Sequence, residues 1–273
     1  MRSGTSQSDS SIISVNSLVL FLSGYLIMYL INLLITATAA VAFDIPVVVY
    51  YNGVDYLIQS NEWTTDSVNV VFSAGPLLAL ILSITFLFVY LRVSMETGIM
   101  RLLLIWMLFH ALTRFFGEML AGALMEKGLG YVIVYSYFMD TAKLLITLLS
   151  LVAMVAAGIL LARPAAYSAN IYFNDLTGKR KFRVLWSQFM TPFLAGNMVI
   201  FLVKLPNVNS FDIAVNTSML LLLGPMLIRS AGMRDLYFDE EPRKIEFRRT
   251  LALITGISLI VFRTFLGMGI RLG

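Results

Sequence analysis

Three ionisable side chains lie in the middle of an apolar stretch that is long enough to cross a lipid bilayer. His110, Arg114 and Glu118 occur within residues 98–123 at intervals of four, so on a helix they project from one face. Ionisable groups are costly at the centre of a membrane, and they mark functional sites or neutralising partners. This face is therefore the first candidate for chemistry.

Three further ionisable residues occupy apolar stretches later in the chain. Asp140 and Lys143 lie about one helical turn apart in the next stretch, and Arg263 lies in the last one. A helix rises about 1.5 Å per residue, and on that scale Arg263 comes to the depth of Glu118. With His110 neutral, cations exceed anions in this set, so a bound anion or water fits the balance of charge.

The depth estimate also predicts an ion pair. Arg114 and Asp140 both come near mid-membrane, on helices that a short turn joins as antiparallel neighbours. We therefore expect the two side chains to pair, with Glu118 in support one turn along the helix. Lys143 comes near the level of His110.

Two interpretations of these buried charges remain open. In the first, the groups neutralise one another and fix the register of the helices, as buried polar networks do. In the second, they line a water-filled cavity and move protons or bind an anion. A dry, fully paired network favours the first interpretation, and a wet cavity that reaches the charges from one side favours the second.

The residue types argue against several kinds of enzyme. The chain has no Cys and one His, which excludes thiolate catalysis and the paired histidines of an HExxH metalloprotease. His110 and Glu118 are about 12 Å apart along a helix, which is too far for them to chelate one ion. We therefore expect no catalytic residue, no metal and no cofactor.

The composition determines the fold class that can position these groups. Of the 273 residues, 59% are hydrophobic and only 13% are charged, and the mean hydropathy is +0.83. Soluble domains carry about 25% charged residues. We predict an all-α polytopic membrane protein with about seven transmembrane helices and one or two small β-hairpins outside the membrane.

We expect a flexible polar tail over residues 1–15 and a single transmembrane domain over residues 16–273. A cleaved signal peptide is the alternative for the first span, because Ala40-Val41-Ala42 resembles a cleavage site, but the apolar run is too long for one. The expected spans are residues 16–43, 67–93, 98–123, 130–163, 184–205, 212–228 and 250–270.

Two segments outside the spans have the pattern of hairpins. Residues 45–59 place Asn52-Gly53 between β-branched and aromatic runs, which is a strong hairpin signal. Residues 235–248 alternate apolar and polar side chains and are a second candidate.

The basic residues predict an orientation. With the amino terminus in the cytoplasm, most of the 20 Lys and Arg residues fall on the cytoplasmic side, as the positive-inside rule requires. We expect an integral protein of a bacterial cytoplasmic membrane, with the first hairpin outside. A basic cluster in one inner loop is expected to contact anionic lipid; it consists of Lys179, Arg180, Lys181 and Arg183.

The order of the elements resembles part of a known family. A first span, a β-hairpin and a span opening with Ser73-Ala74-Gly75-Pro76-Leu77-Leu78 are similar to the amino-terminal half of site-2-type intramembrane metalloproteases. The resemblance covers about residues 20–90. The corresponding first span has no zinc ligand over residues 24–30, and Met139-Asp140-Thr141 lacks the Gly of the family's later ligand motif. The resemblance implies a catalytically degenerate relative that binds or positions other membrane proteins.

Two functions follow from these observations. The first is a non-enzymatic scaffold or assembly partner for another membrane protein, which the missing catalytic motifs and the protease-like order favour. The second is a small transporter or proton-coupled carrier that uses the buried charges.

Overall fold

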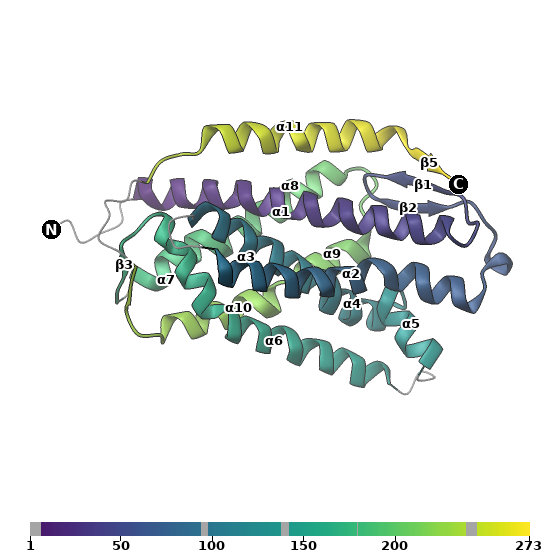
Figure 1. Cartoon of the computed structure of the whole chain (residues 1–273), viewed down its shortest axis with the longest axis horizontal. Helices are drawn as coiled ribbons and strands as arrows, with labels where there is room; N and C mark the ends of the chain where they lie inside the picture. The colour runs from purple at the N-terminus through teal and green to yellow at the C-terminus, as the bar shows by residue number, and fades with distance from the viewer. Residues whose placement is uncertain (1–6, 94–97, 138–141, 179, 239–244) are drawn as a thin grey trace.

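The described part of the chain forms one elongated bundle of helices (Figure 1). The structure is a computed structural model that describes residues 7–93, 98–137, 142–178, 180–238 and 245–273. Within these residues, seven helical segments are long and apolar enough to cross a membrane, which confirms the predicted fold class. The chain is an all-α polytopic membrane protein with small sheets outside its spans.

Several of the crossing segments are interrupted where the helix changes its geometry. Two of the interruptions, η2 and η4, are single π-helical turns. The elements in chain order are α1 Gln7–Val41, β1 Val47–Tyr50, β2 Gly53–Tyr56, η1 Ser60–Glu62, α2 Thr65–Arg92, α3 Gly98–Leu112, η2 Thr113–Gly117, α4 Glu118–Met125, α5 Gly128–Tyr137, α6 Lys143–Tyr167, η3 Ser168–Ile171, β3 Asp175–Leu176, α7 Arg180–Leu185, η4 Trp186–Met190, α8 Thr191–Lys204, α9 Ser210–Ser218, α10 Leu220–Ala231, β4 Leu236–Tyr237, α11 Arg249–Phe265, η5 Leu266–Met268 and β5 Ile270–Leu272.

The first helix begins earlier than the polar tail predicted over residues 1–15 allows. Its Ser-rich first turns pack against the π-helical turn η4. The Ser14 hydroxyl donates to the Ser187 carbonyl at 2.9 Å, and the Ser17 hydroxyl donates to the Gln188 carbonyl at 2.5 Å. A π-turn leaves carbonyl groups without their usual helical donors. These serines supply donors to two of those carbonyls and join the start of α1 to η4.

The fourth predicted span, residues 130–163, is two helices. The short α5 folds back on α4, and α6 alone crosses the bundle; residues 138–141 between them lie outside the described part. Glycine allows the close contact with α4, because a Cβ on Gly130 would lie 2.3 Å from the Ala123 nitrogen and 2.4 Å from the Met119 carbonyl oxygen. The predicted span was too long for one crossing, and the separate helix α5 accounts for the extra residues.

The first predicted hairpin is present and gains a third strand. β1 pairs with β2 so that Tyr50 faces Gly53, and the two-residue loop is therefore Tyr51-Asn52 instead of the predicted Asn52-Gly53. β5 pairs with the other edge of β1, giving the order β2-β1-β5. The last helix ends at Phe265, before the end of the predicted span, because the chain turns at Gly269 with φ of 74° to enter this strand.

The second predicted hairpin, residues 235–248, does not form as expected in the described residues. β4 pairs instead with β3, which belongs to a different loop; residues 239–244 lie outside the described part. A buried lysine joins the two loops, since Lys181 Nζ lies 2.9 Å from Asp235 Oδ1 and also donates to the Met233 carbonyl. Distant loops at one end of the bundle therefore supply the pairing that a local hairpin was expected to supply.

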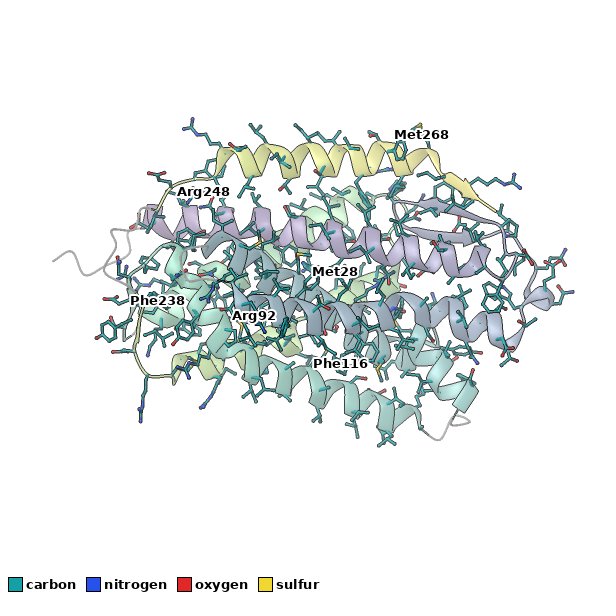
Figure 2. The ribbon with its side chains drawn as sticks, viewed as in Figure 1. Met28, Arg92, Phe116, Phe238, Arg248 and Met268 are labelled. Carbon is teal, nitrogen blue, oxygen red and sulfur yellow. The ribbon has the colours of Figure 1, made fainter. Side chains whose placement is uncertain are left out.

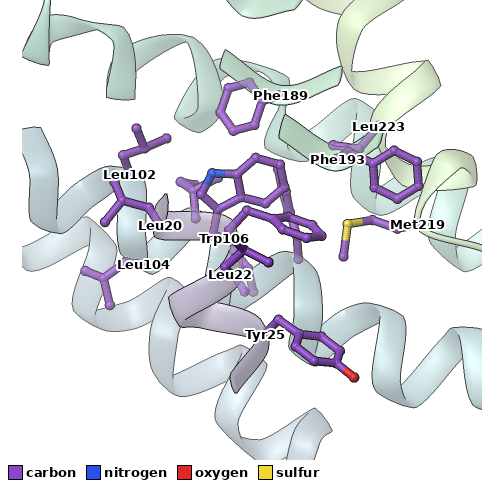
Figure 3. Close-up of a cluster of buried hydrophobic side chains, with 14 of the residues drawn as sticks. Leu20, Leu22, Tyr25, Leu102, Leu104, Trp106, Phe189, Phe193, Met219 and Leu223 are labelled. Atoms are coloured by element: carbon purple, nitrogen blue, oxygen red, sulfur yellow. The ribbon is translucent and has the colours of Figure 1, made fainter. Parts of the chain in front are cut away.

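A cluster of aromatic rings closes the middle of the bundle (Figure 3). Trp106 of α3 is fully buried, and its ring meets Phe21 of α1 edge-on at 4.9 Å and Phe189 of η4 at 5.3 Å between centroids. Its Nε1 donates to the Ser17 hydroxyl at 2.9 Å. The indole thus fills the centre of the core while its polar atom is satisfied.

The outer faces of several helices carry exposed apolar side chains. α11 packs beside α1 at the edge of the bundle, and its side chains project outward (Figures 1 and 2). Leu253, Ile257 and Ile260 on this helix are each at least 60% exposed, as are Leu144 and Leu160 on α6. Lipid chains are the environment that such surfaces require.

The arrangement of the chain ends predicts what labelling will show. The hairpin and the carboxyl terminus lie at one end of the bundle, and α1 begins at the other (Figure 1). Because the chain has no native Cys, single cysteines can report the side. In intact cells a membrane-impermeant maleimide should label Gln59→Cys, and should label Ala231→Cys only after the membrane is permeabilised. The opposite pattern would reverse the orientation that the charge bias predicts.

Candidate functional site

The π-helical turn η2 carries Arg114 and brings it against another helix. Gly117 at the end of this turn has no side chain, and a Cβ there would lie 2.2 Å from the Ser218 hydroxyl oxygen of α9. The close approach of α9 brings Asp212 near the guanidinium, with Arg114 Nη1 3.4 Å from Asp212 Oδ1. π-turns occur frequently at functional sites, and this one places a charge between two segments.

Among the described residues, four side chains form the buried charge network: Arg114, Glu118, Lys204 and Asp212. Arg114 Nε lies 3.4 Å from Glu118 Oε2, and Lys204 Nζ lies 2.6 Å from Asp212 Oδ2. The four side chains are between 3% and 16% exposed. Two cations and two anions balance, so the network buries charge without a net excess.

An aromatic ring supports both cations of this network. Lys204 Nζ lies 3.9 Å from the centre of the Tyr29 ring, and Arg114 Cζ lies 5.7 Å from it. The face of a phenol ring attracts cations. Tyr29 of α1 thereby joins the first segment to the charges carried by the third and fifth.

His110 lies one turn further inward and belongs to the aromatic core. Its Nε2 lies 3.1 Å from the Phe21 carbonyl oxygen, which accepts a hydrogen bond from it. The rings of Phe21 and Tyr25 lie 4.6 Å and 5.8 Å from the imidazole. Among the described residues His110 forms no ion pair, so sharing a helix face with Arg114 does not bring it into the network.

Lys143, another residue singled out from the sequence, lies apart from the network. Lys143 is 35% exposed and pairs with Glu126 at 3.0 Å. The depth estimate placed it too deep because it counted from residue 130, whereas the crossing helix begins at Lys143 itself. Asp140 lies outside the described residues, and the acidic partners that the structure gives to Arg114 are Glu118 and Asp212.

Arg263 connects separate elements of the fold and does not belong to the charge network. Its Nη2 donates to the Leu205 carbonyl at 3.0 Å, and its Cζ lies 3.8 Å over the Tyr51 ring. These contacts join α11 to the turn after α8 and to the hairpin. Arg263 therefore holds the last helix in place.

A cavity of about 620 Å³ lies below the hairpin and reaches the charge network. Its lining includes the little-exposed charges Arg114, Glu118 and Asp212, and also exposed residues of the loops at the hairpin end, Ser60, Lys127 and Asn209. The lining residues are Tyr29, Asn32, Leu33, Thr36, Asn52, Gly53, Val54, Tyr56, Ser60, Trp63, Val68, Val71, Phe72, Pro76, Arg114, Glu118, Glu126, Lys127, Gly128, Tyr131, Asn209, Phe211 and Asp212.

The Gly-Pro pair of α2 shapes one wall of this cavity. A Cβ on Gly75 would lie 2.1 Å from Asn32 Oδ1 and 3.0 Å from the Thr36 hydroxyl, so the glycine makes room for two polar side chains of α1. Asn32 is buried, and its Oδ1 has no hydrogen-bond partner among the described residues. The wall therefore presents a polar side chain whose bonding capacity is unused.

On the side of Arg114 that faces His110, the described residues leave only a small space. The space on the inner side of the guanidinium is a void of about 20 Å³ lined by Tyr25, His110, Thr113 and others. The aromatic cluster around Trp106 (Figure 3) adjoins His110, whose ring lies 6.3 Å from the indole between centroids. The charge network therefore separates a cavity open to the hairpin end from a packed core.

The predicted lipid-binding cluster is largely engaged within the protein. Lys181 is buried, and its bond to Asp235, together with the Gly178 amide, lowers the pKa of that carboxyl below its ordinary value. Arg180 pairs with Asp175 at 3.6 Å. Arg183 is exposed, and Lys179 lies outside the described residues. Contact with anionic lipid thus stays a prediction for the exposed part of the cluster.

Sequence reasoning missed Lys204 and Asp212. Each lies at the end of a helix, where charged residues are commonplace, and so each was assigned to the outer boundary of a span. The signal that was available is their position on either side of a short connection between two spans. Among the described residues no group of three His, Asp or Glu side chains could hold a metal ion.

The buried pair Lys204–Asp212 predicts a strong dependence of stability on both charges. We expect Lys204→Met and Asp212→Asn each to destabilise the protein by on the order of 3 kcal/mol, because each leaves a partner charge buried. The double variant should recover part of the loss. Thermal unfolding in detergent measures this cycle, and additive losses would contradict a direct interaction.

The surface pair Lys143–Glu126 is the matched control. Lys143→Met and Glu126→Gln should each change stability by less than about 1 kcal/mol, as exposed pairs do.

No family model matches the chain, and comparisons with curated proteins and with solved structures found no match.

Proposed function

We propose that this integral membrane protein is a carrier that binds a small polar solute from the hairpin side. The observation that carries the proposal is the cavity of about 620 Å³ with a buried charge network as its floor. Pockets for small molecules have volumes of about 300–1,000 Å³ and a few converging polar groups. A charge network that serves only to hold helices together does not require a cavity beside it.

Interruptions in the helices around the cavity support movement. Arg114 lies on the π-turn η2, and α2 contains Pro76 in the cavity wall. Interrupted helices whose freed backbone groups line a site are a recurring feature of membrane transporters. Such points allow two packed halves of a segment to change their angle.

The charge bias of the loops supports an orientation for this carrier. With the amino terminus in the cytoplasm of a bacterial cell, the cavity opens to the outside. The solute would then enter from outside and meet the network before the aromatic core.

A scaffold for another membrane protein is the second candidate function. The network is paired within the chain, with Lys204 2.6 Å from Asp212, and a paired network also serves to fix helix register. The order of elements that resembles a degenerate site-2-type protease supports the same candidate. The two functions differ in whether a solute enters the cavity.

Access to the cavity can be measured with single cysteines on α1. Thr36 lines the cavity, whereas Leu34, two residues away, is 59% exposed on the apolar outer surface. A membrane-impermeant maleimide added from the hairpin side should label Thr36→Cys and leave Leu34→Cys unlabelled. Equal labelling of the two, or none at Thr36→Cys, would show that the cavity is not an aqueous entrance.

Transport itself requires a second measurement. Purified protein in liposomes should take up at least one radiolabelled solute from a panel of amino acids, betaines and carboxylates, and Arg114→Lys should abolish that uptake. Absence of uptake for the whole panel, together with a stoichiometric protein partner in native membranes, would favour the scaffold.

A further inference from the structure

We propose that the cavity takes a zwitterionic ligand, with its anionic group on Arg114 and its ammonium group between Glu118 and an aromatic wall. The wall is formed by Tyr56, Trp63 and Phe72. This inference deepens the proposed solute-binding function and rests on it. It follows from how the charges of the network are shared and from what lies above them.

The network leaves one opposite-charge pair available to a ligand. Asp212 is held by Lys204 at 2.6 Å, whereas both contacts of Arg114 with carboxylates are 3.4 Å long. Arg114 Nε has no hydrogen-bond partner among the described residues. Glu118 Oε1 accepts one long bond, 3.5 Å, from the Leu129 amide. A guanidinium has five N–H donors and a carboxylate has about four acceptor sites, so both groups have capacity to spare.

A ligand of one sign fits this pair poorly. A simple anion on Arg114 draws it from Glu118 and leaves that carboxylate uncompensated in a buried place, and a simple cation on Glu118 does the same to Arg114. A ligand with both charges replaces one long ion pair with two contacts of opposite sign. The neutral balance of Arg114, Glu118, Lys204 and Asp212 is then preserved.

The aromatic wall suits the cationic end of such a ligand. Trp63 and Phe72 stack with centroids 5.4 Å apart and rings inclined by 28°, and Tyr56 meets them edge-on at 5.1 Å and 5.7 Å. Aromatic faces together with a carboxylate attract ammonium groups, quaternary ones above all. Glu118 lines the same cavity as this wall, and burial and then the charge of Glu118 raise the pKa of Tyr56 above its ordinary value.

Two sources can present this chemistry. One is a free solute such as an amino acid or betaine, and the other is the zwitterionic headgroup of a lipid. Exposed residues at the hairpin end, Ser60, Lys127 and Asn209, belong to the lining of the cavity, and a solute that approaches from water would meet the cavity there.

The test uses the full chain in nanodiscs of phosphatidylglycerol, which has no ammonium group. Isothermal titration calorimetry should show saturable binding of glycine betaine, and no saturable binding of tetramethylammonium chloride or sodium acetate. Saturable binding of either single ion as tight as that of betaine would overturn the zwitterion. No binding of betaine, when maleimide still reaches Thr36→Cys, would also overturn it while leaving the cavity intact.

The two sources are separated by changing the lipid. Nanodiscs of phosphatidylcholine carry the same quaternary ammonium and an anionic phosphate. Weaker apparent binding of betaine in these nanodiscs identifies the headgroup as a competing occupant, and unchanged binding identifies a free solute. Both results support the shared chemistry.

Variants supply readouts that a folding defect would not produce. Glu118→Gln should gain saturable acetate binding, because Arg114 is then left without that neighbouring carboxylate. Trp63→Leu should weaken betaine binding on the order of tenfold, the size expected for a desolvated cation–π contact. Trp186→Leu, in a residue exposed at the opposite end of the bundle, is the matched control and should leave binding unchanged. Equal effects at Trp63 and Trp186, or no acetate binding by Glu118→Gln, would contradict the assignment.

Discussion

The buried contact between Arg114 and Asp212 sets the arrangement of the bundle around its site. A guanidinium cannot be left uncompensated among apolar helices. Besides Glu118 one turn along, Arg114 has a carboxylate partner from α9, almost a hundred residues later in the chain. Lys204 of α8 then shares Asp212 at 2.6 Å. The network therefore joins the third, fifth and sixth crossing segments at one depth, and Gly117 permits the close approach that it needs.

The same arrangement makes the two ends of the bundle different. On the inner side of Arg114, His110 and the rings around Trp106 fill the space (Figure 3). On the hairpin side the helices separate around the cavity, and Gly75 leaves room there for polar groups of α1. A cavity that ends on paired charges, beside a closely packed aromatic core, is the physical basis of the proposed carrier.

Features that depend on local sequence were predictable. The seven spans follow from the length of apolar runs, because every backbone group in lipid must be satisfied within its own helix. The hairpin at β1 and β2 follows from turn residues between β-branched runs. The common face of Arg114 and Glu118 follows from helical spacing, and the two do contact each other at 3.4 Å. These properties need only neighbours within a few residues.

Features that depend on which elements meet were decided by the tertiary structure. Lys204 and Asp212 have the sequence context of ordinary helix ends. Only the packing of α9 against η2 makes Asp212 a buried partner of Arg114 and brings Lys204 into the same network. His110 shares the helix face of Arg114 but meets the aromatic rings of α1 instead of a charge. β5 and β3 find their partner strands across the chain. Sequence thus determined where charge enters the membrane, and the fold determined which charges neutralise one another, because pairing depends on the contacts between helices.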